Sequence, residues 1–282
     1  MKSRTWFRNL ALLVGFAFLY IPILSMVVYS FNNSRLVTVW DTADSPTLKW
    51  YRVLFDNEQI LSAAWLSIQV AAVTATGAVI LGTLAGLVLA RFGPFKGRTL
   101  LSAMTTAPLV MPEVITGLSL LLLFVSLEQL IGWPQGRGFI TIVIAHITFS
   151  MAYVTVVVQS RLATFDDSLE EAALDLGARP AKVFFRITLP LILPAILSGW
   201  LLAFTLSWDD LVISQFVAGP GSTTLPMVVF SKVRLGVSPD INALATIMVT
   251  IVGIGVVLSA FYMRRQERRL ALEMQLAKAE KA

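Results

Sequence analysis

The sequence predicts an all-α integral membrane protein with six transmembrane helices. Only 14% of its 282 residues are charged, whereas an ordinary soluble domain has about 25% charged residues. Hydrophobic residues make up 56% of the chain, and the mean hydropathy is +0.77. A chain of this size cannot hide so much apolar surface inside a water-soluble fold, so lipid is its expected solvent.

Six apolar runs are long enough to cross a bilayer, which takes about 20 residues of helix. They cover residues 10–31, 63–90, 100–127, 139–159, 191–217 and 243–263, and each is expected to cross once. The first run is longer than the apolar part of a signal peptide, so it is interpreted as a retained anchor. In the second run, Gly82 and Gly86 form a small-xxx-small pair that predicts close helix packing.

The distribution of basic residues predicts the orientation. With the N-terminus inside, 16 of the 22 Lys and Arg residues fall in cytoplasmic segments and 6 in outer segments. The positive-inside rule therefore predicts that both termini are cytoplasmic. The expected division is a cytoplasmic N-terminus (1–9), a six-span membrane domain (10–263) with a cytoplasmic loop (161–190), and a basic cytoplasmic tail (264–282). Because the basic residues flank apolar runs, membrane lipid is expected as a partner and nucleic acid is not.

Several classes of function are disfavoured by what the sequence lacks. There is no cysteine, which rules out disulfides, thiolate metal sites and a cysteine nucleophile. No GxxxxGK[ST] motif is present, so the chain is not expected to bind ATP itself. Without HExxH or GxSxG, and with one histidine, it is not expected to be an enzyme or to hold a metal or cofactor. A secondary transporter or channel is the alternative class, but no clear inverted repeat supports it.

The loop between the fourth and fifth runs has the pattern of a tightly capped helix. Asp167 is expected to be its N-cap, with Glu170 completing a capping box, and the acids Glu170 and Glu171 suit the first turn. Gly177 is placed to end the helix in a left-handed conformation. Pro180 then suits the first turn of a second short helix, over residues 181–187.

One side of this helix carries a narrow apolar stripe with small residues at its centre. Its members recur at three- and four-residue spacing and are Leu169, Ala172, Ala173 and Leu176. A small apolar ridge edged by acids is suited to docking in a groove on another protein. The alternative is a surface helix that covers the end of its own bundle, and the residues alone leave both open.

This loop resembles the EAA motif of ABC importer permeases. The matching residues are Glu171-Ala172-Ala173, Gly177, Ile187 and Leu189-Pro190. The resemblance implies a type I ABC importer permease fold with a coupling helix seated in a separate ATP-binding subunit. The residues implied to couple to that ATPase are Glu170, Glu171, Ala172, Ala173 and Gly177.

The family also implies the partners of the chain. They are a dimer of ATP-binding cassette subunits, which would bind ATP and Mg, a second, unlike permease and a periplasmic binding protein. The chain itself would be a non-catalytic subunit of an ATP-hydrolysing transporter.

Three further segments, residues 106–117, 207–213 and 224–227, resemble the polyamine branch of the family. Within that branch the resemblance is to the second of the two permeases of putrescine transporters. It implies import of putrescine across the bacterial inner membrane, from periplasm to cytoplasm, by alternating access. The alternative substrates are spermidine or another small solute.

Four residues are candidates for the path of a cationic substrate. Asp209 and Asp210 interrupt the fifth run, and Glu113 lies about midway through the third. An acid at bilayer depth costs about 2.5–3.5 kcal/mol on insertion scales and normally faces a cavity or a partner. Trp208 adds an aromatic face for cation–π contacts. The alternative is that the Asp pair lies at headgroup level or pairs with Lys232 or Arg234.

His146 is the only histidine and lies inside the fourth run. It is expected to make an interhelical hydrogen bond rather than to line the substrate path.

Overall fold

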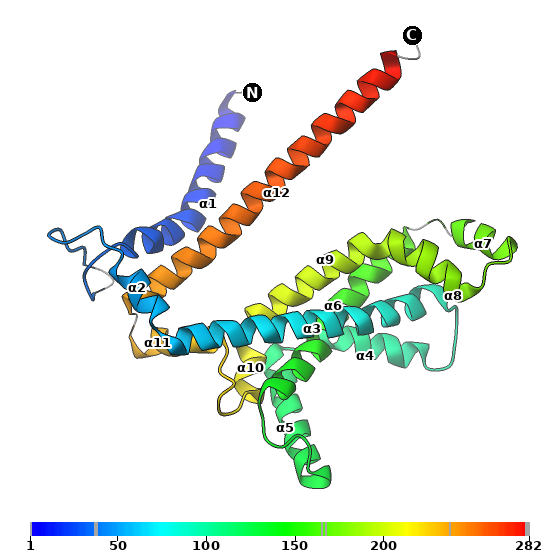
Figure 1. The fold of residues 1–282 in the computed structure, drawn as a ribbon, viewed down its shortest axis with the longest axis horizontal. Coiled ribbons are helices and arrows are strands. Elements are labelled where there is room, and N and C mark those ends of the chain that lie inside the picture. The colour runs from blue at the N-terminus through cyan, green and yellow to red at the C-terminus, as the bar shows by residue number, and fades with distance from the viewer. Residues whose placement is uncertain (1, 37–38, 165, 167, 237, 280–282) are drawn as a thin grey trace. The chain divides into compact units, whose positions relative to one another are not determined.

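The computed structural model describes residues 2–279 apart from 37, 38, 165, 167 and 237, and within them all regular secondary structure is helical (Figure 1). This confirms the all-α prediction. The helices are α1 (Lys2–Tyr29), α2 (Lys49–Phe55), α3 (Glu58–Arg91), α4 (Arg98–Val110), α5 (Glu113–Ile131), α6 (Phe139–Ala163), α7 (Ser168–Asp175), α8 (Pro180–Val183), the π-helix η1 (Phe184–Thr188), α9 (Leu189–Trp208), α10 (Val212–Val217), α11 (Leu225–Leu235) and α12 (Pro239–Ala279). The chain forms two compact units, one of Met1–Glu58 with Lys232–Ala282 and the other of Gln59–Ser231.

Five helices of the described residues are long and apolar enough to cross a membrane. They are Thr5–Tyr29, Glu58–Arg91, Glu113–Ile131, Phe139–Ala163 and Pro180–Trp208. The sixth predicted run lies in α12, where the described apolar stretch is Pro239–Gly255, and the sixth crossing stays a prediction. The helix itself continues to Ala279.

The third predicted run is not one helix, so that part of the prediction is wrong. α4 ends at Val110 and α5 begins at Glu113. Between them, Met111 is extended, with φ −74° and ψ 137°. The ring of Pro112 clashes with a helical residue before it, which explains why the helix stops there.

The fifth predicted run is also divided. α9 ends at Trp208 and α10 begins at Val212. In the turn between them, Asp210 accepts hydrogen bonds from the backbone N–H groups of Ile213 and Ser214. An aspartate that caps the backbone in this way favours a new helix start over the continuation of the old helix.

The unit Gln59–Ser231 is built around α6, which carries buried apolar residues along its length, including Ile142, Ala145 and Val154. α3 packs on α6 at two glycines of α3, where no side chain separates the helices. A Cβ added to Gly82 would lie 2.7 Å from the Cβ of Val154, and one added to Gly86 would lie 3.1 Å from Val158 Cγ1. The small-xxx-small prediction for this pair is therefore confirmed.

The other unit holds α1, α2, α12 and the segment between α1 and α2. This segment folds around the side chain of Asn32, which is 1% exposed. Asn32 donates from Nδ2 to the carbonyl of Val39 at 2.7 Å and accepts at Oδ1 from the N–H of Asp41 at 2.9 Å. Its own carbonyl accepts from the Trp50 indole at 2.7 Å, which ties the segment to α2.

Candidate functional site

α7 ends in a fixed turn at Gly177. The φ angle of Gly177 is +81°, and the N–H of Ala178 donates to the carbonyl of Ala173 while the N–H of Gly177 donates to that of Leu174. These two bonds form a Schellman motif, which favours glycine because a side chain is strained at positive φ. The predicted left-handed helix end at Gly177 is confirmed.

The residue predicted as the N-cap of α7 is Asp167. Asp167 lies outside the described residues. Asp166 Oδ1 accepts the backbone N–H of Ser168 at 3.0 Å, and this bond, together with one from the Ser168 side chain, lowers the pKa of Asp166. The carboxylate of Glu170 contacts Thr188 and Arg91.

The faces of α7 separate the predicted coupling residues into two groups. Glu171, Ala172 and Gly177 are exposed, whereas Glu170 and Ala173 are half-buried. Large apolar side chains are exposed as well, with Leu169 at 49% and Leu176 at 89%. The exposed group therefore presents an apolar surface with an acid beside it, and Glu170 belongs to the side that faces the rest of the chain.

The segment after α7 leads into the membrane helix without a break. Pro180 is the first residue of α8, as predicted, but α8 continues through η1 into α9. The expectation of a separate short helix over residues 181–187 is wrong. η1 is a π-helical turn, and such turns mark an inserted residue and are frequent at functional sites. Val183, directly before η1, and Thr188, its last residue, are buried, at 5% and 4% exposure.

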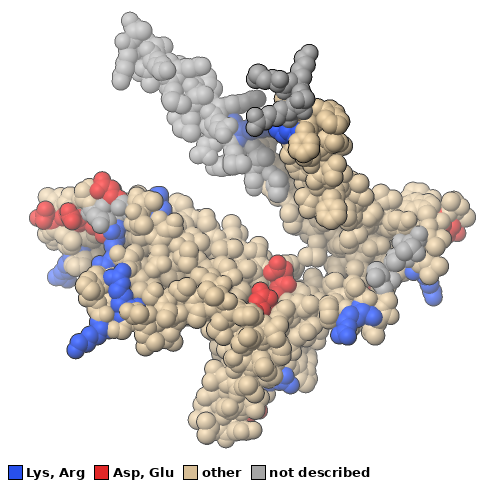
Figure 2. Space-filling model, turned by 180° about the vertical axis from the view of Figure 1, so that it is seen from behind, with Lys and Arg blue, Asp and Glu red and all other residues tan. Residues whose placement is uncertain are grey.

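Charged side chains gather at this end of the unit, on the left in Figure 2. Four basic residues of the loop after α3 and of the segment after α7 are exposed, namely Lys96, Arg179, Lys182 and Arg186. A mixed charged surface around an apolar ridge is suited to contact with a protein.

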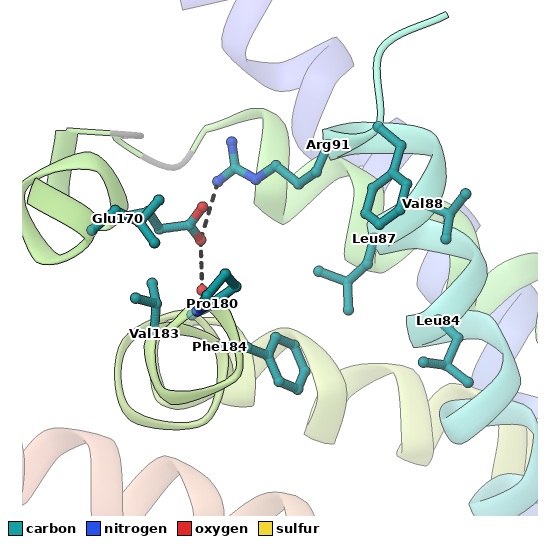
Figure 3. A pocket seen from close by; sticks show the side chains of 11 residues that line it. Leu84, Leu87, Val88, Arg91, Glu170, Pro180, Val183 and Phe184 are labelled. Atoms are coloured by element: carbon teal, nitrogen blue, oxygen red, sulfur yellow. Dashed lines mark hydrogen bonds and ion pairs between the residues drawn. The ribbon is translucent and has the colours of Figure 1, made fainter. Parts of the chain in front are cut away.

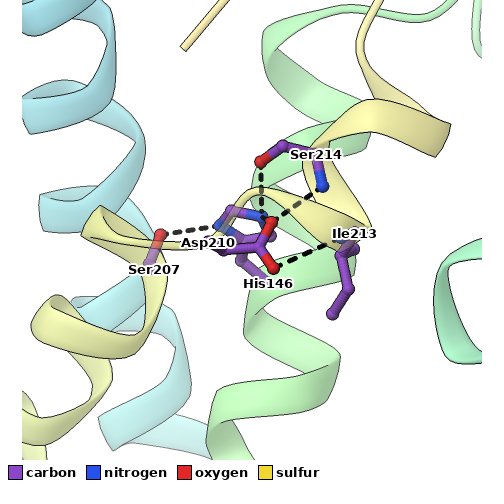
Figure 4. Close-up of polar contacts among 5 residues, drawn as sticks. All are labelled: His146, Ser207, Asp210, Ile213 and Ser214. Atoms are coloured by element: carbon purple, nitrogen blue, oxygen red, sulfur yellow. Dashed lines mark hydrogen bonds and ion pairs between the residues drawn. The ribbon is translucent and has the colours of Figure 1, made fainter. Parts of the chain in front are cut away.

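A second polar cluster lies where α9 gives way to α10 (Figure 4). His146, on α6, is 1% exposed. Its Nδ1 lies 2.7 Å from Ser207 Oγ on α9, and its Nε2 lies 3.0 Å from Asp210 Oδ2. Nε2 is also 3.2 Å from Ser214 Oγ on α10. The prediction that His146 bonds between helices is confirmed.

The two acids of the Asp pair have different surroundings. Asp210 is largely buried, with 7% of its side chain exposed, and it accepts from His146 and from the start of α10. Asp209 follows the last residue of α9 and is exposed. Lys232, one of the alternative partners considered for the pair, forms an ion pair with Asp240.

Asp209 follows a row of three aromatic side chains on α9. Trp200 stacks on Phe204 with ring centroids 5.4 Å apart, and Phe204 stacks on Trp208 at 6.1 Å. The rings recur every four residues, so they share one side of the helix. An exposed carboxylate next to half-buried aromatic faces has the chemistry to attract an ammonium group.

Glu113 is exposed and is the first residue of α5, directly after the break at Pro112. One turn further on, a Cβ added to Gly117 would lie 3.3 Å from Ile213 Cα and 2.7 Å from the Phe216 ring. The helix that begins with Glu113 therefore packs on the helix that follows Asp210. Glu113 thus starts a helix rather than lying in the middle of one.

Four polar residues of these clusters were not predicted from the sequence: Arg91, Thr188, Ser207 and Ser214. Arg91 was counted only among the basic residues whose distribution predicts the membrane orientation. For Ser207 and Ser214 a signal did exist, because His146 and Asp210 are isolated polar residues in apolar runs and each needs hydrogen-bonding partners. Among the described residues, no three His, Asp or Glu side chains gather as a metal site requires.

Comparison with known proteins identifies the family. Residues 78–272 match the model of the family described as binding-protein-dependent transport system inner membrane component. The chain is 57% identical over 275 residues to the putrescine transport system permease protein PotI of Escherichia coli strain K12, covering 98% of this chain and 97% of that protein. It is 41% identical over 263 residues to the spermidine/putrescine transport system permease protein PotC of Haemophilus influenzae, covering 93% and 98%.

The fold is similar to that of a chain in the crystal structure of a bacterial ABC transporter involved in the import of the acidic polysaccharide alginate. The TM-score is 0.69 at 16% identity, and the match covers 92% of this chain and 96% of that one. This similarity confirms the predicted ABC importer permease fold. The sequence match over more than half of the chain and the helical architecture lead to one assignment: the chain belongs to the family of binding-protein-dependent transport system inner membrane components.

Proposed function

We propose that this chain is the membrane-spanning permease subunit of an ATP-driven importer that moves putrescine from periplasm to cytoplasm by alternating access. The observation that carries the proposal is the 57% identity, over nearly the whole length of both chains, to a permease named for putrescine transport. The exposed Asp209 beside the aromatic row on α9 supports a cationic substrate.

The energy for transport would enter through α7. The exposed residues Glu171, Ala172 and Gly177 would contact a dimer of ATP-binding cassette subunits, which bind ATP and Mg. The Schellman turn at Gly177 and the unbroken path from α8 to α9 support this role, because a displacement of α7 then reaches a membrane helix without a flexible linker. A second, unlike permease and a periplasmic polyamine-binding protein would complete the transporter, with both termini of this chain in the cytoplasm.

Within the substrate path, the two aspartates would have separate roles. Asp209, which is exposed, would pair with an ammonium group of the diamine, with Trp208 contributing a cation–π contact and Glu113 a second acid. Asp210 would hold the break between α9 and α10 in place, since its carboxylate already accepts three hydrogen bonds.

The test is uptake by the reconstituted transporter. The chain would be assembled with the second permease and the ATP-binding subunits in liposomes, and the binding protein supplied outside. ATP-dependent uptake of labelled putrescine is expected, and a parallel assay with labelled spermidine identifies the preferred polyamine. Preferred uptake of spermidine would show that spermidine, and not putrescine, is the main substrate. ATP-independent transport would contradict the proposed mechanism.

A further inference from the structure

We propose that Arg91, Glu170 and Thr188 form a latch through which α7 moves together with α3 as well as with α9. The inference rests on the proposed function of α7 as the helix that receives the movement of the ATPase. It assigns Glu170 a positioning role inside this chain, distinct from contact with the ATPase.

The latch converges on one oxygen atom. Glu170 Oε1 accepts a hydrogen bond from Thr188 Oγ1 at 2.6 Å and lies 3.7 Å from Arg91 Nη2. Thr188 is the last residue of η1, and Arg91 is the last residue of α3. In Figure 3 the Glu170 carboxylate lies between the Arg91 guanidinium and the helical segment that carries Pro180, Val183 and Phe184. Three segments, the end of α3, α7 and η1, are therefore joined at a single carboxylate.

The three side chains of the latch are mostly buried, and this burial strengthens the interactions between them. The side chains of Glu170 and Arg91 are each 21% exposed, and Thr188 is 4% exposed. A fully exposed ion pair contributes little because water and salt screen it. A charge-assisted hydrogen bond in a mostly buried site is stronger and more directional than a neutral one.

A cavity beside the latch shows why a polar link matters here. It has a volume of about 390 Å³ and lies between the end of α3 and the α7–α8–η1 segment. Leu87 and Val88 line it on the side of α3, and Leu174 and Phe184 line it on the other side. Dispersion contacts fall away steeply once atoms separate. Apolar packing is therefore reduced where α7 approaches α3, and the ion pair of Glu170 with Arg91 spans this gap.

The consequence concerns how a movement of α7 is distributed. The backbone connects α7 to α9 through Gly177, α8 and η1. The backbone gives no such connection from α7 to α3, since α4, α5 and α6 come between them in the sequence. With the latch intact, a displacement of α7 carries both helices. With the latch broken, α9 follows while α3 lags, and ATP hydrolysis no longer produces a full movement of the permease.

The experiment compares Glu170→Ala, Glu170→Gln and Arg91→Ala with the charge swap Arg91→Glu/Glu170→Arg in the reconstituted transporter. Two quantities are measured: ATP hydrolysis stimulated by the loaded binding protein, and putrescine taken up per ATP hydrolysed. We expect each single variant to assemble and hydrolyse ATP while uptake per ATP falls at least about fivefold, the lower end of typical coupling between sites. The swap should recover most of the loss. Glu170→Gln keeps the shape of the side chain and an acceptor for Thr188, so it decides the result if Glu170→Ala fails to assemble.

Asp175→Asn is the matched control, because it removes one negative charge from the same helix at an exposed position outside the latch. Its uptake per ATP should match that of the wild type. Normal coupling in Glu170→Gln and Arg91→Ala would overturn the latch, and so would an equal loss in Asp175→Asn or an assembled swap variant that recovers nothing. If the wild-type transporter itself imports no putrescine, the proposed function fails instead, which keeps the two failures distinct.

Discussion

Nε2 of His146 and Oδ2 of Asp210 lie 3.0 Å apart, and this contact joins α6 to the break between α9 and α10. A carboxylate only accepts, so Nε2 carries the proton of this bond, and in the neutral imidazole Nδ1 accepts from the hydroxyl of Ser207. The histidine therefore contacts the last turn of α9 through one nitrogen and the turn before α10 through the other.

The first prediction concerns the stability of this junction. His146→Ala removes one of the three hydrogen bonds that the buried carboxylate of Asp210 accepts, and it removes the partner of the buried Ser207 hydroxyl. A buried polar group left unsatisfied costs about 1–3 kcal/mol. We expect a lower melting temperature of the detergent-purified protein. Thr148→Ala is the control, because the Thr148 hydroxyl only bonds the carbonyl of Ile144 within α6, and it should shift the melting temperature little. An unchanged melting temperature in His146→Ala would contradict the role of the cluster.

The second prediction separates the two aspartates. Asp209→Asn should reduce uptake of putrescine without changing the melting temperature, because the side chain of Asp209 is exposed. Asp210→Asn should lower the melting temperature as well, by an amount that reflects about 1–3 kcal/mol, because an amide replaces a carboxylate that accepts from His146 and Ser214. Uptake and thermal unfolding are measured on the same preparations. A stable Asp210→Asn protein with impaired uptake would instead place Asp210 in the path.

The Asp pair illustrates how far the sequence leads. Two acids inside an apolar run indicate a functional or paired site, because an isolated charge at that depth is costly. Which acid has which partner depends on α6, whose residue His146 lies 64 positions away from Asp210 in the sequence. Such a contact depends on tertiary packing, so the local sequence pattern cannot predict it.

The breaks within the membrane helices were also not predicted from the sequence. Hydropathy located the apolar runs, and its averaging window does not register a single residue that stops a helix. Pro112 ends α4 through its effect on Met111, and Asp210 starts α10 with its carboxylate. The first break has a local signal in the proline itself. The second requires knowing that the aspartate side chain turns toward the backbone ahead of it.

The third prediction tests the contact between α3 and α6. Gly82→Val places a Cβ 2.7 Å from Val154 Cβ and 2.9 Å from the carbonyl oxygen of Met151. Overpacking of this kind typically costs 1–3 kcal/mol, so about that loss is expected in the free energy of unfolding. Gly15→Ala is the control, since nothing lies within 4 Å of its added Cβ. Equal stability of Gly82→Val and the wild type would mean that α3 and α6 are less closely packed than described.

Local chemistry was sufficient to predict the turn after α7. Gly177 was expected in a left-handed conformation because it is a glycine placed at the end of a capped amphipathic segment. The structure agrees, with φ of +81°. The inward contact of Glu170 could not be predicted in this way, because Arg91 is distant in sequence and was explained by membrane topology alone.

The fourth prediction uses this turn to test coupling. Gly177→Val forces a β-branched residue into a positive-φ position, where an ordinary side chain costs about 1–2 kcal/mol, so the bend between α7 and α8 should open or shift. The protein should still insert, because Gly177 is exposed and lies outside the membrane-spanning helices, and uptake of putrescine per ATP should fall. Gly177→Asn should be milder, since asparagine tolerates this conformation better. Insertion is measured by membrane fractionation and coupling in proteoliposomes. Wild-type uptake in an inserted Gly177→Val protein would remove the turn from the mechanism, because the strained position would then have no bearing on how α7 moves α9.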